Sequence, residues 1–375
     1  MIVLLVYIAI MLMTGMCISK KMYGIYFFIF ALGLGFIAFY YSPDLTKDLY
    51  RHYKTLENYK IYGFDYFYMF EKSSSLPMYA FYFYIMSLLP YYGFLPAITC
   101  FLVYGLNFWV IYRIALKFSL PKSSMLIGVF FIISNLNYIG VISGIRNNLA
   151  FTLFFLLNYL ELIEKKNKVI CWVLMILLGL FHSSIYIVLF CKFIAMIINK
   201  YSRKVVYVIL AVSSLFGARV VSYVVEKLNF IGSDKIFEDF LWKTTYYLDW
   251  TTTNSWYYYR NVMVMFLTVT IFFYFYFKRR KLVQEYRTYV NLFLMLIIIT
   301  IGFAFNDIVF GRLAIAVCLF SIIPMELLLT TNSNNQNNKF ILRVSPIKIY
   351  ILLECIISLI YYTKLGGWAD LILKF

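Results

Sequence analysis

The sequence predicts an all-α bundle of transmembrane helices, and three observations support that fold class. Of the 375 residues, 63% are hydrophobic and only 14% are charged, and the mean hydropathy is +0.80. A soluble domain is about 45–50% apolar and about 25% charged. The apolar residues also form runs that suit bilayer-spanning helices of about 20 residues. We therefore expect a polytopic bundle of about 11–13 membrane segments, forming a single integral-membrane domain over residues 1–375.

The start of the chain and its charge agree with this class. The run MIVLLVYIAIMLMTGMC has no charged region before it and no small-residue cleavage site, so we expect a first transmembrane helix rather than a signal peptide. The net charge is +17, which in a soluble protein would suggest nucleic acid. In a membrane protein it is typical of cytoplasmic loops rich in Lys and Arg. We expect membrane lipid, and no nucleic acid, around this chain.

Basic turns define the expected topology. The turns assigned to the cytoplasm lie near 20–21, 113–122, 164–168, 200–204, 278–287 and 331–346. Two longer polar stretches, about 41–75 and 223–258, are assigned to external loops, and the charges of the first nearly balance. Residues 76–90 are short for a span and rich in Tyr and Phe, which predicts an interfacial or re-entrant segment.

Three basic residues then fall at the outer ends of expected helices. Arg146 follows a helix expected over 124–141, His182 interrupts two short apolar runs, and Arg312 precedes a helix expected over 313–330. A guanidinium beside a helix N-terminus can bind phosphate oxygens in pairs. The alternatives are arginines that reach lipid headgroups and a histidine satisfied in the core. Because both arginines lie in a glycine-containing turn on the same side, we favour an anion site.

The first external loop adds candidate substrate-binding residues. Asp48 and Arg51 are one helical turn apart, Asp44 lies a turn before them, and Arg51, Tyr53 and Asp44 could share one face. Asp307 lies in the last external turn. A solvated helix with i,i+3 pairing explains the first group equally well. The aromatic residues of 41–92 suit sugar stacking, although an aromatic belt at the membrane interface is the commoner cause.

Motifs for metal or nucleotide chemistry are missing from the sequence. The six cysteines all lie in apolar runs without metal-ligand spacing, and the chain has only two histidines. There is no Walker A, GxGxxG, HExxH or GxSxG motif and no DxD-type acidic pair. We expect neither a metal nor a cofactor.

Four short pieces, in their order and spacing, resemble the EpsG-like / Wzy family of bacterial polysaccharide polymerases. They are the Asp- and Tyr-rich stretch Pro43–Tyr53, the turn Gly144–Ala150, the break Gly179–Ser184, and Arg312 opening a helix that ends near Pro324. The resemblance covers most of the chain. It implies a GT-C-like membrane glycosyltransferase of the bacterial inner membrane, with its active site facing the periplasm.

The resemblance also implies a substrate and a reaction. The substrate would be an undecaprenyl-pyrophosphate-linked oligosaccharide, the repeat unit of an O-antigen, capsule or exopolysaccharide. The growing glycan would move from its lipid carrier onto the non-reducing end of a new lipid-linked unit. A chain-length regulator and a flippase would be partner proteins. A non-enzymatic flippase or exporter of the same lipid-linked glycan, an O-antigen ligase and a membrane acyltransferase remain rival readings.

Roles for the candidate residues follow from that reaction. Arg146 and Arg312 would stabilise the departing pyrophosphate. Asp48, Asp44 and His182 are the candidates for the base that activates the acceptor hydroxyl, and the sequence does not choose among them. The expected catalytic set is therefore Arg146, His182, Arg312 and Asp48, and the expected substrate-binding set is Asp44, Arg51, Tyr53 and Asp307.

Overall fold

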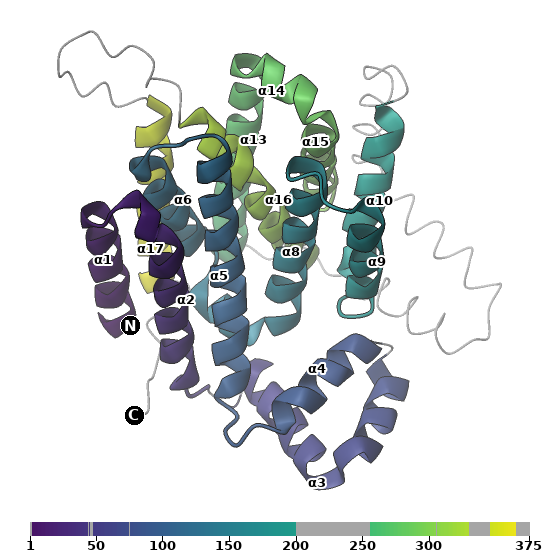
Figure 1. The fold of residues 1–375 in the computed structure, drawn as a ribbon. Coiled ribbons are helices and arrows are strands. Elements are labelled where there is room, and N and C mark those ends of the chain that lie inside the picture. The colour runs from purple at the N-terminus through teal and green to yellow at the C-terminus, as the bar shows by residue number, and fades with distance from the viewer. Residues whose placement is uncertain are drawn as a thin grey trace.

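The fold is an all-α membrane bundle, as the sequence predicts. The computed structural model describes residues 2–43, 45, 48–74, 76–199, 256–304, 306–329 and 346–364, and the elements in these ranges are helices (Figure 1). Two expected features, the turn at 200–204 and nearly all of the loop 223–258, lie outside the described residues, as does the 331–345 part of the last basic turn.

The helices of the first half run from the N-terminus to residue 163. They are α1 (Ile2–Cys17), α2 (Tyr23–Phe39), α3 (Asp48–Ser74), α4 (Pro77–Ser87), α5 (Phe94–Lys117), α6 (Lys122–Asn135), α7 (Tyr138–Ser143) and α8 (Ile145–Asn158), with a 3-10 turn at Lys20–Met22 and a π turn at Tyr159–Ile163. The second half contains α9 (Lys168–Gly179), α10 (Ser184–Ile198), α13 (Trp256–Lys278), α14 (Arg280–Glu285), α15 (Arg287–Gly302), α16 (Asp307–Leu328) and α17 (Pro346–Lys364).

Four of the described helical segments are long and apolar enough to cross a membrane. They are Lys20–Phe39, Phe94–Lys117, Tyr258–Lys278 and Asp307–Leu328, and the described residues also contain shorter apolar helices. This confirms the polytopic α-helical class, while the number of 11–13 membrane segments stays a prediction. The Tyr- and Phe-rich segment at 76–90 forms the 11-residue helix α4, which packs on α3.

The bundle has two distinct ends. The described basic turns contact one another: Lys20 donates to the Leu120 carbonyl at 2.8 Å, Lys122 donates to the Ile18 carbonyl, and Lys117 and Lys165 both lie over the Tyr286 ring. The helices α3 and α4 lie at the other end of the bundle (Figure 1). We name the two ends the basic end and the α3–α4 end.

The helix α16 lies at the centre of the bundle and contains a proline, and a side chain of a neighbouring helix donates the hydrogen bond that the proline cannot. Most of its side chains are buried, and it packs against α13, α15, α8, α5 and α6. Pro324 lies inside it and cannot donate to the carbonyl one turn earlier. The Tyr289 hydroxyl of α15 donates to that Phe320 carbonyl at 2.6 Å instead. The central helix therefore keeps its backbone acceptor satisfied where the proline breaks the ladder.

Two buried polar groupings hold outer helices to this centre. Lys192 of α10 forms an ion pair with Glu161 of the π turn, and the Trp172 indole of α9 donates to the same carboxylate at 3.2 Å. Both ends of the pair are buried, so each charge depends on the other. At the end of α6, the Asn135 carbonyl accepts from Arg260 of α13 and from the Tyr362 hydroxyl of α17.

Two predicted helix boundaries are wrong, each because of an asparagine cap. The helix expected over 124–141 is divided, because Asn137 accepts from the Ile139 N–H at 3.1 Å and starts the separate helix α7. The helix expected over 313–330 begins earlier, because Asn306 accepts from the Val309 N–H at 2.9 Å. Gly311 and Arg312 therefore lie inside α16, so Arg312 does not open a helix as predicted.

Candidate functional site

Arg146 lies at the α3–α4 end, in the first turn of α8, and the backbone before it is tightly folded. The Asn148 amide donates to the carbonyls of Gly140 at 2.8 Å and Gly144 at 3.1 Å. A Cβ at Gly144 would lie 2.7 Å from the Gly140 carbonyl oxygen, so a residue with a side chain would clash at this position. The turn between α7 and α8 therefore has one compact form, and it presents Arg146 beside the free N–H groups of a helix N-terminus.

The Arg146 guanidinium rests on an aromatic ring and keeps its donors accessible. Its central carbon lies 4.9 Å from the ring centroid of Tyr79, a buried residue of α4. Arg146 is exposed, and among the described residues no carboxylate forms an ion pair with it. A cation held on a ring face is positioned without being neutralised. It can therefore bind an incoming anion.

His52 fixes the position of that ring and was not predicted as a site residue. Its Nδ1 lies 3.2 Å from the Tyr79 hydroxyl, and the imidazole also hydrogen bonds to the Ser143 backbone. Burial, followed by the nearby Arg146 charge, lowers the pKa of His52 to about 4. The neutral imidazole thus connects α3, α4 and the turn before Arg146. The available signal was that the chain has only two histidines, since both occur at this site.

His182 lies in the turn between α9 and α10, as predicted, and its side chain is only 6% exposed. Its ring packs edge-on against Phe151 of α8 at 6.0 Å, and its Nε2 has no hydrogen-bond partner among the described residues. Burial, then the charges of Arg312 and Arg146, lower the pKa of His182 to about 3. Both arginines therefore lie within electrostatic reach of this neutral imidazole, which brings the three predicted basic residues together.

Arg312 reaches the site from α16, the helix that Asp307 begins. Asp307 is the first residue of the helix and is buried, so its charge lies where the helix dipole favours an anion. Arg312 follows in the second turn and is partly buried. The site is thus formed at the helix starts of α8 and α16 and at the turn between α9 and α10.

The structure places the loop residues differently. Asp48 and Arg51 form the i,i+3 pair at 3.4 Å, but their side chains are 62% and 73% exposed, as expected for a solvated helix. Tyr53 packs against Tyr92, with ring centroids 5.7 Å apart, rather than against Tyr79. Asp44 lies outside the described residues. Of this group, Asp48 acts electrostatically on His52, raising its pKa.

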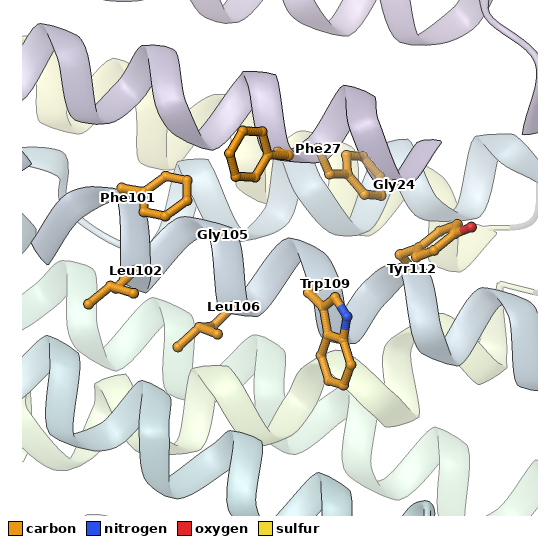
Figure 2. Close-up of a pocket in the computed structure, with 9 residues that line it drawn as sticks. Gly24, Phe27, Phe101, Leu102, Gly105, Leu106, Trp109 and Tyr112 are labelled. Carbon is orange, nitrogen blue, oxygen red and sulfur yellow. The ribbon is translucent and has the colours of Figure 1, made fainter. Parts of the chain in front are cut away.

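An apolar hollow elsewhere in the bundle is unsuited to anionic chemistry. It has a volume of about 240 Å³ and lies between α2 and α5, with Phe27, Phe101, Trp109 and Tyr112 around it (Figure 2). Of the described residues that line it none is charged, and only Trp109 and Tyr112 among them have polar side-chain atoms. Among the described residues, no group of three His, Cys, Asp or Glu side chains is placed to hold a metal ion.

The arrangement at the α3–α4 end suits a doubly charged anion. Two guanidiniums supply fork-shaped donors, the α8 N-terminus supplies backbone N–H groups, and a neutral imidazole supplies one further hydrogen-bonding atom. Because His182 is neutral and buried beside two cations, protonating it is unfavourable. This argues for His182 as a hydrogen-bonding group and against it as the general base.

Comparison with known proteins supports a specific family. The EpsG family model matches residues 20–370, nearly the whole chain. No curated protein and no solved structure matches.

Proposed function

Because the chain belongs to the EpsG family, whose members are polysaccharide polymerases of the Wzy type, we propose that it joins lipid-linked oligosaccharide repeat units by glycosyl transfer. The proposed leaving group is undecaprenyl pyrophosphate. The bond between the anomeric carbon and the pyrophosphate oxygen breaks, and a bond from that carbon to an acceptor hydroxyl forms. The hydroxyl proton passes to a carboxylate base, and the electron pair leaves with the pyrophosphate.

The convergence of Arg146, His182 and Arg312 is the observation that supports this reaction. Negative charge grows on the pyrophosphate as its bond breaks, so fixed donors at that point lower the barrier. Loss of one such donor costs about 2.7–4 kcal/mol in comparable sites, or about 10²–10³ in rate. Asp48 is the candidate base, because it lies on α3 one turn before His52 and is accessible to an acceptor.

The expected location follows from the charge of the two ends. Short loops rich in Lys and Arg remain in the cytoplasm, and the described basic turns gather at the end opposite α3 and α4. The proposed site would then face the periplasm of a bacterial inner membrane. A flippase that delivers the lipid-linked unit and a chain-length regulator are the proposed partners.

The test is a glycan ladder from cells that carry substituted protein. Arg146→Ala and Arg312→Ala should each leave single-unit glycan on the surface and no polymer. Arg280→Ala is the matched control, because it removes an exposed arginine at the basic end. A full ladder from either site variant would remove that residue from the mechanism.

Deletion and reconstitution separate the rival functions. Deletion of a polymerase leaves one repeat unit on the surface, whereas deletion of a flippase or ligase leaves essentially none. Purified protein in lipid vesicles with the purified lipid-linked unit should form polymer without any other protein. Absence of polymer there, together with loss of all surface glycan on deletion, would favour the flippase.

A further inference from the structure

An open aromatic cleft lies where α3 meets the ends of α2 and α5. It has a volume of about 340 Å³ and is formed where α2 ends and α5 begins, with a wall from α3. Its ring-bearing residues are Phe39, Tyr40, Tyr41, Tyr53 and Tyr91. The volume is near the lower limit of ordinary ligand pockets, about 300–1,000 Å³. The cleft could therefore hold one or two small rings.

A close contact between two helix ends forms the floor of the cleft. A Cβ on Gly93 would lie 2.4 Å from the Phe39 carbonyl oxygen, so the glycine allows the chain before α5 to touch the end of α2. Tyr91 then packs edge-on against Phe39 with ring centroids 6.2 Å apart. Tyr91 is 65% exposed, whereas Tyr41 is 4% exposed. The cleft thus has a buried base and an accessible ring at its rim.

The cleft and the arginine site share one turn of α3. His52 faces Tyr79 and the turn before Arg146, while the next residue, Tyr53, lines the cleft and packs on Tyr92. Consecutive Cα atoms are about 3.8 Å apart, and successive helical side chains diverge by about 100°. The two features are therefore connected through adjacent residues of α3.

The lining favours an uncharged, hydroxyl-rich ring. Among the described residues that line the cleft none is charged, and four of them are tyrosines. The tyrosines offer ring faces for apolar C–H surfaces and phenolic hydroxyls for hydrogen bonds. Sugars have both kinds of surface. The rings of an interfacial aromatic belt are exposed throughout, whereas here Tyr41 is buried and Tyr91 is exposed.

We propose that this cleft binds a sugar ring of the glycan whose pyrophosphate occupies the Arg146 site. The proposal rests on the proposed function, because that function defines the anion as part of a glycan. It assigns α3 two roles, with His52 holding the aromatic support of the arginine and Tyr53 forming the wall of the sugar subsite.

Binding of the lipid-free repeat-unit oligosaccharide to the full-length protein in detergent tests the proposal. Titration calorimetry should show Tyr91→Leu weakening binding by about fivefold to tenfold, as expected for one lost stacking face. Tyr91→Phe keeps that face and should remain nearer to the wild type. Tyr68→Leu is the matched control, because Tyr68 is a similarly exposed aromatic residue of α3 that does not line the cleft.

Arg146→Ala distinguishes failure of the cleft from failure of the enzyme. If the cleft binds the sugar, this variant should bind the lipid-free oligosaccharide with the affinity of the wild type and form no polymer. Wild-type protein that polymerises but does not bind the oligosaccharide, or Tyr91→Leu protein that is folded and binds like wild type, would overturn the subsite. Wild-type protein that binds the oligosaccharide through Tyr91 but forms no polymer would leave the subsite standing and overturn the polymerase.

Discussion

Replacement of Tyr79 should separate two contributions to the position of Arg146. Tyr79 supplies a ring face to the guanidinium at 4.9 Å and a hydroxyl to His52 at 3.2 Å. Tyr79→Phe removes the hydrogen bond alone, which is worth about 0.5–1.5 kcal/mol. Tyr79→Leu also removes the cation–π contact, worth about 0.5–2 kcal/mol. If these energies act on the transition state, the Phe variant should polymerise about two- to tenfold more slowly and the Leu variant about five- to several-hundredfold more slowly.

The assay is the initial rate of polymer formation in vesicles that contain purified protein and a saturating amount of lipid-linked unit. Thermal unfolding in detergent accompanies each variant, because Tyr79 is buried and its loss also affects stability. In an Arg146→Lys background the difference between the Phe and Leu variants should shrink, since the flat guanidinium is no longer there to stack. Equal rates for the Phe and Leu variants in the Arg146 protein would refute the claim that the ring positions the guanidinium.

Three further predictions concern buried polar groups of the bundle and of the site. Lys192→Met should lower the free energy of unfolding by about 3–5 kcal/mol, whereas adding Glu161→Gln should restore much of it, as measured by thermal unfolding; equal loss in the single and double variants would contradict an energetically coupled pair. Tyr289→Phe leaves the Phe320 carbonyl without its hydroxyl donor and should cost about 1–3 kcal/mol by the same measurement, and an unchanged unfolding temperature would contradict that role. Because the folded pKa of His52 is about 4, below the ordinary value of about 6.5, folding favours the neutral imidazole; its stabilisation is complete above pH 6.5 and is lost as pH falls toward 4. His52→Gln should therefore show a shallower fall in unfolding temperature over that range, and an unchanged slope would contradict the shift.

The membrane class and the central residues of the site could be predicted because they depend on composition and on short stretches of the sequence. Composition and apolar runs determine the class, and alternation of basic turns places Arg146, His182 and Arg312 on one side. The structure brings both arginines within electrostatic reach of His182. The boundary of α16 could not be predicted from apolar periodicity alone, because the Asn306 side chain starts the helix before the apolar run begins.

Other features depend on contacts between distant segments, which one sequence does not display. In the sequence, nothing distinguishes Tyr79 from the other aromatic residues of its Tyr-rich stretch. Its role depends on its contacts with Arg146 and His52, which are distant in the chain. His52 stood in a stretch that the sequence singled out, but its partners lie 27 residues away on α4 and at Ser143. The exposed pair Asp48–Arg51 is the opposite case, because its spacing alone predicted the contact, and a solvated helix was one of the two explanations that the sequence offered for it.

The contact between α13 and α17 affects how the protein is assembled during synthesis. Arg260 is buried, and the Asn135 carbonyl that it binds also accepts from Tyr362, whose ring lies 4.7 Å from the guanidinium. Tyr362 leaves the ribosome about 100 residues after Arg260, which at about 5–20 residues per second is a delay of roughly 5–20 s. During that interval Arg260 would have no contact with Tyr362. The last helix therefore completes a polar site formed by earlier ones, and ribosome-bound chains that end before α17 should remain more accessible to water at Arg260 than the finished protein.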